Sequence, residues 1–127
     1  MTKLVLIRGI PGSGKSTFAK SPKFEGYQHF ETDMFWEAYR INFDYKRLGE
    51  AHRWCQDMVS KYLAENIPVV VSNTFVRQWE MEPYLDMTKD VTVYRMTGEF
   101  KNIHGVPDKT VRRMKHQFED YEGEILV

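Results

Sequence analysis

The stretch with the clearest chemical signature is GIPGSGKST at residues 9–17. Its spacing, G-x-x-x-x-G-K-S, is typical of a P-loop, which binds phosphate groups through backbone amides. Glycine lets the backbone approach a phosphate closely, lysine can reach the β- and γ-phosphates, and the serine hydroxyl can ligate Mg²⁺. The alternative is a glycine-rich turn that only connects a strand to a helix. A lysine followed by two hydroxyl residues has no packing purpose, so we favour phosphate binding.

We predict that this loop binds ATP, or another nucleoside triphosphate, together with Mg²⁺. Lys15 would offset charge on the transferred phosphoryl group, and the Ser16 hydroxyl would ligate the magnesium ion. The predicted nucleotide-binding residues of the loop are Gly9, Pro11, Gly12, Ser13, Gly14, Lys15, Ser16 and Thr17.

Asp33 is the first candidate on the acceptor side of the reaction. It ends the segment YQHFETD, which we expect to be a strand. At the carboxyl edge of an open parallel sheet, a carboxylate can accept the proton of an attacking hydroxyl. The alternative is that Asp33 caps the helix that begins at Met34, with Thr32 as a competing cap.

Asn73 and Thr74 end the segment VVVSNT at the same expected edge. They could orient a phosphate, a water or the acceptor, or form a turn that caps the helix beginning near Arg77. No apolar strand ends in the aspartate that usually completes a P-loop magnesium site. Magnesium would then depend on Ser16, on Asp33 as a further candidate ligand, and on water.

Apolar patterning predicts alternating strands and helices. We expect strands over 4–7, 27–33, 69–72 and 91–96, and helices from residue 14 and over 48–66, 77–87 and 106–122, the third interrupted near Pro83. This alternation indicates a parallel sheet between two helical layers. The expected architecture is an α/β P-loop NTPase fold, a three-layer sandwich with about four parallel strands and a short helical lid.

Composition narrows the class of protein. A chain of 127 residues with 42% hydrophobic side chains can bury one core, so we expect residues 1–127 to form one P-loop kinase domain. Its 18 basic and 18 acidic residues cancel, which argues against a general DNA-coating protein. Four histidines and one cysteine lack the spacing of a zinc site.

The same features suggest where the protein works. Cys55 is a single cysteine and cannot form an internal disulfide, and the first ten residues lack the apolar length of a signal peptide. No apolar run approaches the roughly 20 residues of a membrane span. We therefore expect a cytoplasmic protein with no membrane partner. The oligomeric state is open, and a monomer is compatible with the sequence.

Several segments together resemble a known family. They are GIPGSGKST, ETD, FDYKRLGEAHRWCQ, VVVSNT, QWEMEPYL and NIHGVPDKTVRRMKHQFE. They are similar to the AAA-type small P-loop kinase-like domain of Nedd-four-binding proteins and, more distantly, to the 5′-kinase domain of bacteriophage polynucleotide kinase. The resemblance covers nearly the whole chain, whose size is that of a stand-alone, phage-like or bacterial version.

The resemblance implies phosphoryl transfer from a nucleoside triphosphate to a hydroxyl. Lys15 and Ser16 match the phosphate and magnesium residues of the phage enzyme, and Asp33 matches its general base. Arg112 falls where that enzyme has a lid arginine that steadies the transferring phosphate, which makes it a third catalytic and nucleotide-binding candidate. A planar, always charged guanidinium suits this task. The alternative for Arg112 is a solvated helix face.

The sequence departs from the family at the acceptor side. Trp36 stands where the phage enzyme has an arginine for the acceptor nucleotide, and Asn73 stands where it has an aspartate. The D-N-T of the related branch is Ser72-Asn73-Thr74 here. A tryptophan could stack on a base or ring, so Trp36 joins Asp33, Asn73 and Thr74 as an acceptor-binding candidate, or it belongs to the core.

These observations favour an ATP- and Mg²⁺-dependent kinase whose acceptor is the 5′-hydroxyl of a polynucleotide end. The near-zero charge weakens that choice of acceptor, since a polynucleotide groove usually carries clustered lysine and arginine. One alternative is a kinase of a nucleoside, nucleotide or sugar. Another is a nucleotide-binding switch or interaction module without turnover. Arg77 and Arg95 could approach phosphates, or form ordinary surface ion pairs.

Overall fold

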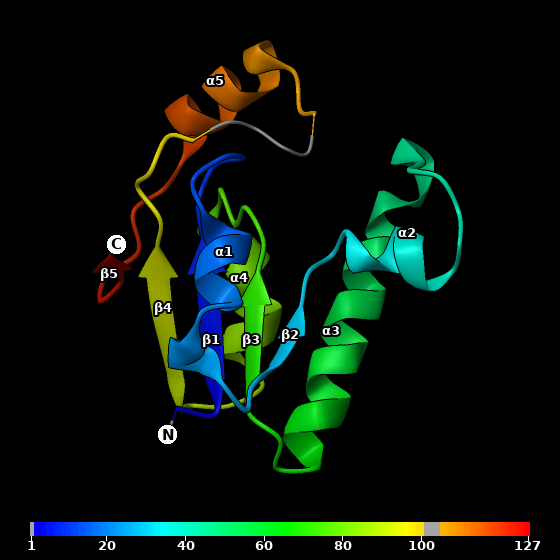
Figure 1. Ribbon diagram of the computed structural model, residues 1–127, viewed down its shortest axis with the longest axis vertical. Coiled ribbons are helices and arrows are strands. Elements are labelled where there is room, and N and C mark those ends of the chain that lie inside the picture. The colour runs from blue at the N-terminus through cyan, green and yellow to red at the C-terminus, as the bar shows by residue number, and fades with distance from the viewer. Residues whose placement is uncertain (1, 101–104) are drawn as a thin grey trace.

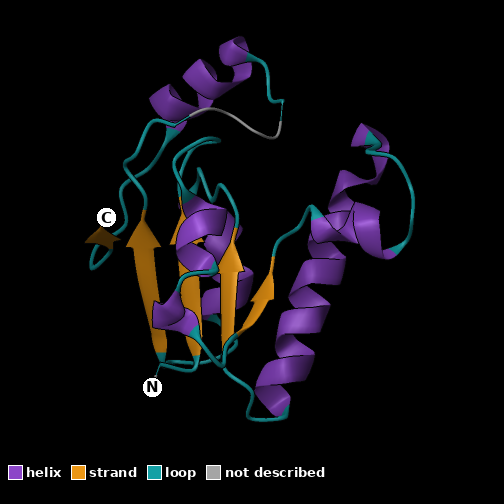
Figure 2. Ribbon diagram, viewed as in Figure 1, coloured by secondary structure: helices purple, strands orange, loops and turns teal. Residues whose placement is uncertain are grey.

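Five parallel strands form one sheet in the order β2-β3-β1-β4-β5, with helices on both faces (Figures 1 and 2). This computed structural model describes residues 2–100 and 105–127, so the first three residues of the resembling segment NIHGVPDKTVRRMKHQFE lie outside the described residues. The strands are β1 Leu4–Arg8, β2 Gln28–Phe30, β3 Val69–Ser72, β4 Val91–Arg95 and β5 Ile125–Leu126. The α-helices are α1 Lys15–Ala19, α2 Met34–Ala38, α3 Leu48–Ala64, α4 Gln78–Leu85 and α5 Asp108–Gln117, and the 3₁₀ turns are η1 Pro22–Phe24 and η2 Tyr45–Arg47.

The apolar strands β1 and β3 form the middle of the sheet, and all their residues are buried. Successive side chains of a strand point to opposite faces, so each strand contributes to two cores. Leu4 and Leu6 pack with Val59 of α3 and Met81 of α4 on one face. On the other face, Val5, Ile7 and Val70 pack against Ala19 of α1 and Phe24 of η1. The predicted three-layer α/β architecture is confirmed.

The predicted elements differ from the structure in several places. The strand expected over 27–33 is β2, which ends at Phe30, so Asp33 lies beyond it on the segment before α2. The helix over 77–87 is continuous from Gln78 to Leu85 with Pro83 inside it. Pro83 is the sixth of the eight residues, so it lacks the amide that would bond to the Trp79 carbonyl, but the helix still continues to Leu85. The last helix ends at Gln117 rather than residue 122, and the chain then adds β5, a fifth strand that pairs Ile125 with Tyr94.

The segment after α5 is anchored to the sheet by a cluster of ion pairs around a phenyl ring, which we call the C-terminal anchor. Arg8 and Glu124 are its buried members and Asp120 is exposed. The anchor consists of Arg8, Arg95, Phe118, Asp120 and Glu124. The Phe118 ring centre lies 4.4 Å from the Arg8 guanidinium carbon and 4.5 Å from that of Arg95. Arg8 donates to Glu124 at 2.8 Å, and Arg95 donates to Asp120 at 2.5 Å and to Glu124 at 3.2 Å. The anchor fixes the C-terminal end of α5 beside β1 and β4, and α5 itself lies beyond the carboxyl ends of the strands (Figure 1).

Candidate active site

Residues 9–14 connect β1 directly to α1, as a P-loop requires. Gly12 and Gly14 have φ values of 82° and 96°, in the left-handed region that favours glycine. The loop is held to the sheet because the Gly9 amide donates to the Thr74 carbonyl at 3.1 Å. A Cβ at Gly9 would lie 2.4 Å from the Ser13 hydroxyl oxygen, so a side chain there would force the loop to move. This close backbone path needs glycine at three positions of the motif.

Lys15 begins α1 and is half-buried at the loop. Its Nζ donates to the Ile10 carbonyl at 3.0 Å. Burial lowers the pKa of Lys15 to about 8, although the nearby carboxylates of Glu31 and Asp33 favour its charged form. The ammonium group is therefore held inside the loop, close to where a phosphate would need its charge.

Five of the polar side chains predicted for donor and acceptor border one cavity of about 290 Å³ at the carboxyl ends of β1, β2 and β3, namely Lys15, Ser16, Asp33, Asn73 and Thr74. It is bordered by polar residues, namely Lys15, Ser16, Glu31, Thr32, Asp33, His52, Ser72, Asn73 and Thr74. Its apolar residues are Pro11, Phe43, Leu48, Val106 and Met114, so the cavity lies between α5 on one side and the η2–α3 region on the other. We call it the central cavity.

Asp33 borders the central cavity and its side chain makes no capping hydrogen bond to α2, although it occupies the N-cap position. Thr32 does not cap the helix with its side chain either, because its hydroxyl lies 3.2 Å from His52 Nδ1. The Asn73 side-chain oxygen accepts a hydrogen bond from the Thr32 amide at 2.9 Å and so ties the end of β3 to the end of β2. Asn73 thus positions the segment that carries Asp33.

Glu31 also borders the central cavity, although no role was predicted for it from the sequence. Its Oε1 accepts from the Ser16 hydroxyl at 2.5 Å and from the Ser72 hydroxyl at 2.7 Å, and lies 3.3 Å from His29 Nε2. Burial alone would raise the pKa of Glu31. The hydrogen bonds from His29, Ser16 and Ser72 together have the larger opposite effect and lower the pKa to about 2. Glu31 is therefore a carboxylate at neutral pH. Its position directly after a buried strand residue, at the same sheet edge as Asp33, was the available signal.

Trp36 and Arg112 lie away from the central cavity. The Trp36 side chain is only 9% exposed and packs with Phe35 and Ala51, in agreement with the core alternative. Its ring centre is 5.3 Å from that of Phe43, which does border the cavity, so Trp36 supports the cavity wall from behind. Arg112 is exposed on α5 and borders neither this cavity nor the smaller one described next. Thr17 is exposed on α1.

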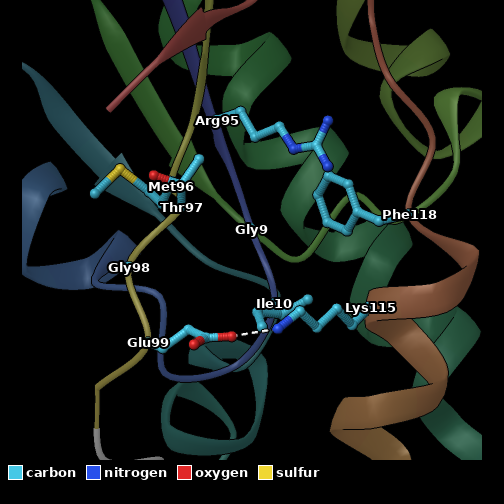
Figure 3. Close-up of a pocket in the computed structure, with 9 residues that line it drawn as sticks. All are labelled: Gly9, Ile10, Arg95, Met96, Thr97, Gly98, Glu99, Lys115 and Phe118. Carbon is cyan, nitrogen blue, oxygen red and sulfur yellow. Dashed lines mark hydrogen bonds and ion pairs between the residues drawn. The ribbon is translucent and has the colours of Figure 1, made fainter.

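A smaller cavity of about 160 Å³ lies on the other side of the P-loop, between the end of β4 and α5 (Figure 3). Gly9 and Ile10 border it from the loop, and Phe118 borders it from the C-terminal anchor. Lys115 of α5 forms an ion pair with Glu99 across its opening. It is bordered by none of the predicted catalytic residues, whereas Lys15 and Asp33 border the central cavity.

The two other arginines considered in the sequence are engaged in ion pairs. Arg95 belongs to the C-terminal anchor, and Arg77 lies 3.5 Å from Glu119. Within residues 2–100 and 105–127, no three His, Cys, Asp or Glu side chains gather closely enough to hold a metal ion by themselves. In the same part of the chain, no helix combines the length and apolar character needed to cross a membrane.

Comparison with known proteins supports the resemblance found in the sequence. The family described as AAA domain matches residues 4–101, which is more than half of the chain. NEDD4-binding protein 2 of Homo sapiens is 32% identical over 135 residues, covering 93% of this chain. The chain spans only 8% of the length of that relative.

Two solved structures show the same fold at low sequence identity. A sugar kinase from Janibacter sp. HTCC2649 superposes with a TM-score of 0.73 at 16% identity, covering 100% of this chain and 85% of that chain. A chain of the Pnkp1/Rnl/Hen1 RNA repair complex gives a TM-score of 0.68 at 17% identity, covering 94% and 46%. The P-loop between β1 and α1, the parallel sheet and the matched family agree: the chain is a P-loop kinase-like member of the AAA domain family.

Proposed function

We propose that this protein transfers the γ-phosphate of ATP, or of another nucleoside triphosphate, to a hydroxyl group, with Asp33 as the general base. The observation that carries the proposal is that Lys15, Ser16 and Asp33 border one cavity at the carboxyl ends of the strands. Donor phosphates and an acceptor hydroxyl can meet there, which phosphoryl transfer requires.

The step follows from these positions. The acceptor oxygen attacks the γ-phosphorus while its proton passes to the Asp33 carboxylate, and the bond from the γ-phosphorus to the bridging oxygen breaks to release the diphosphate. Lys15 offsets negative charge on the transferring group. Arg112 is exposed on α5 and borders neither cavity, so its proposed role requires α5 to move toward the bound nucleotide. Asn73 holds the Thr32 amide and so keeps Asp33 in place. Asp33 later releases its proton to solvent.

The cavity also fits a magnesium ion bound with the nucleotide. Its oxygen donors include the Ser16 hydroxyl and carboxylates, which are the ligands that Mg²⁺ prefers alongside substrate phosphates. When bound, the ion would neutralise charge on the β- and γ-phosphate oxygens.

For the acceptor, our first candidate is the 5′-hydroxyl of a polynucleotide end. The similarity in fold to a chain of an RNA repair complex supports it, as does the resemblance to the phage kinase domain. Only the terminal nucleotide would need to enter the cavity. A formal net charge of zero implies that contacts along the strand would be few and local.

A small-molecule acceptor is the second candidate, and the cavity itself favours it. Phe43, Leu48 and Met114 give the cavity apolar walls, and a volume of about 290 Å³ is at the small end of ligand pockets. The fold similarity to a sugar kinase points in the same direction. An acceptor with one flat apolar face and a hydroxyl would match these walls.

A panel of acceptors separates these candidates. Radiolabelled ATP with Mg²⁺ would be offered to 5′-hydroxyl DNA and RNA oligonucleotides, nucleosides, nucleoside monophosphates and sugars, with Asp33→Asn in parallel. Labelled oligonucleotide ends from the wild type alone would support the first candidate, and label confined to small acceptors would support the second. Tight ATP binding with no labelled acceptor would favour a nucleotide-binding module instead.

A further inference from the structure

The central cavity holds a carboxylate that the proposed reaction does not yet use. Glu31 lies on the segment that follows β2, and its side chain is 16% exposed where it borders the cavity. All three of its described contacts are made by Oε1, which faces Ser16, Ser72 and His29. Among the residues that the structure describes, Oε2 makes no hydrogen bond or ion pair, which leaves it for a ligand in the cavity.

The contact with Ser16 suits metal binding. A hydroxyl has one proton to donate and two lone pairs on its oxygen. Because Ser16 donates its proton to Glu31 at 2.5 Å, its oxygen keeps its lone pairs for a cation beside the P-loop. A carboxylate in contact with that serine also adds the negative charge that a divalent cation needs.

Ser72, at the end of β3, accounts for the position of the Glu31 carboxylate on the segment after β2. The resemblance gives aspartate at position 72, and this chain has serine there. The Ser72 hydroxyl donates to Glu31 at 2.7 Å, and Ser72 is only 3% exposed. Because an aspartate at 72 would put a second carboxylate against Glu31 in a buried place, the two acidic positions are alternatives to each other.

We propose that Glu31, on the segment after β2, supplies the carboxylate of the magnesium site, in place of the aspartate that usually ends an apolar strand in a P-loop site, and acts with Ser16. The assignment rests on the proposed nucleotide and metal site, and it is independent of the acceptor. Glu31 would bind the ion directly or through a water. Asp33 is then left free to serve as the base.

Metal binding can be measured apart from turnover. Electron paramagnetic resonance would follow free Mn²⁺ in the presence of ADP, for the wild type and for Glu31→Gln. Glutamine keeps the shape and an acceptor oxygen for Ser16 and Ser72 but removes the charge. We expect Mn²⁺ affinity to fall by about tenfold or more, while ADP binding in EDTA and the melting temperature stay near the wild-type values. Glu50→Gln, at an exposed glutamate on α3, is the matched control.

A carboxylate introduced at position 72, at the end of β3, tests whether Mn²⁺ binding can be restored in the absence of Glu31. The double variant Glu31→Ser with Ser72→Asp is expected to recover most of the Mn²⁺ affinity that Glu31→Ser alone loses. Unchanged Mn²⁺ affinity in Glu31→Gln would overturn the assignment. A loss of Mn²⁺ affinity in Asp33→Asn instead of Glu31→Gln would also overturn it, as would a wild type that does not bind ADP and Mn²⁺ together. Wild-type ADP and Mn²⁺ binding that depends on Glu31, without transfer to any acceptor, would contradict the proposed function alone.

Discussion

Removing the Glu124 carboxylate is expected to destabilise the protein strongly, because it leaves the buried Arg8 charge without its ionic partner. The Arg8 side chain is 0% exposed and that of Glu124 is 8% exposed, and their atoms are 2.8 Å apart. Arg8 also donates to the Phe75 carbonyl at 2.7 and 3.1 Å, so its hydrogen bonding would be only partly lost. Breaking a buried pair of this kind costs about 3 kcal/mol, near the low end of measured values.

Thermal and urea denaturation would measure this effect. For a domain of this size, about 3 kcal/mol corresponds to a melting temperature lower by about 10 °C in Glu124→Ala. Adding Arg8→Met should restore part of the loss, because the double variant no longer buries an unpaired charge. The control is Glu50→Ala, which removes an exposed partner of Arg47 and should leave the melting temperature unchanged. A Glu124→Ala protein as stable as the wild type would refute this reasoning.

Three further predictions concern the P-loop and the core. Lys15→Ala should weaken ATP binding and transfer together, and an unchanged ATP affinity by calorimetry would undermine the P-loop assignment. Burial raises the pKa of the Cys55 thiol, so an aromatic disulfide reagent at pH 8 should label it only after denaturation; rapid labelling of folded protein would contradict this. Gly98→Ala should lower the free energy of unfolding by about 1–3 kcal/mol in urea denaturation, because its Cβ would lie 2.9 Å from the Ser13 carbonyl oxygen. Gly49→Ala is the control, because a Cβ there meets no atom within 4 Å and should not destabilise the protein.

The central strands and the P-loop were predictable because their signals are local. The run of apolar residues at 4–7, followed by Arg8 and a glycine-rich turn, has few alternative structures. The segment VVVS coincides with β3, and the helix expected over 48–66 is α3, Leu48–Ala64. These elements carry their own periodicity and end signals.

The C-terminal anchor was not predictable because it depends on contacts between distant parts of the chain. Residues 118–122 show a helical pattern, but Phe118 instead packs on two arginines that come from β1 and β4. The two-residue strand β5 carries no periodicity of its own, and its pairing with β4 follows from the anchor.

The acceptor side of the site shows the same limit. Position in the sequence placed Asp33 and Asn73 at the strand ends, and both border the central cavity. From the spacing alone, Trp36 could bind the acceptor or belong to the core. Its burial on α2 against Phe35 and Ala51 is what favours the core. Glu31 was passed over because its contacts, with Ser16 and Ser72, come from two other segments.

The most direct test of the central claim is a single-turnover transfer assay on the best acceptor of the panel, run beside ATP-binding calorimetry for the wild type and Asp33→Asn. We expect Asp33→Asn to bind ATP with near wild-type affinity and to lose transfer by at least about 100-fold, because its general base is removed. Transfer by Asp33→Asn at the wild-type rate would contradict the role of Asp33 as the base.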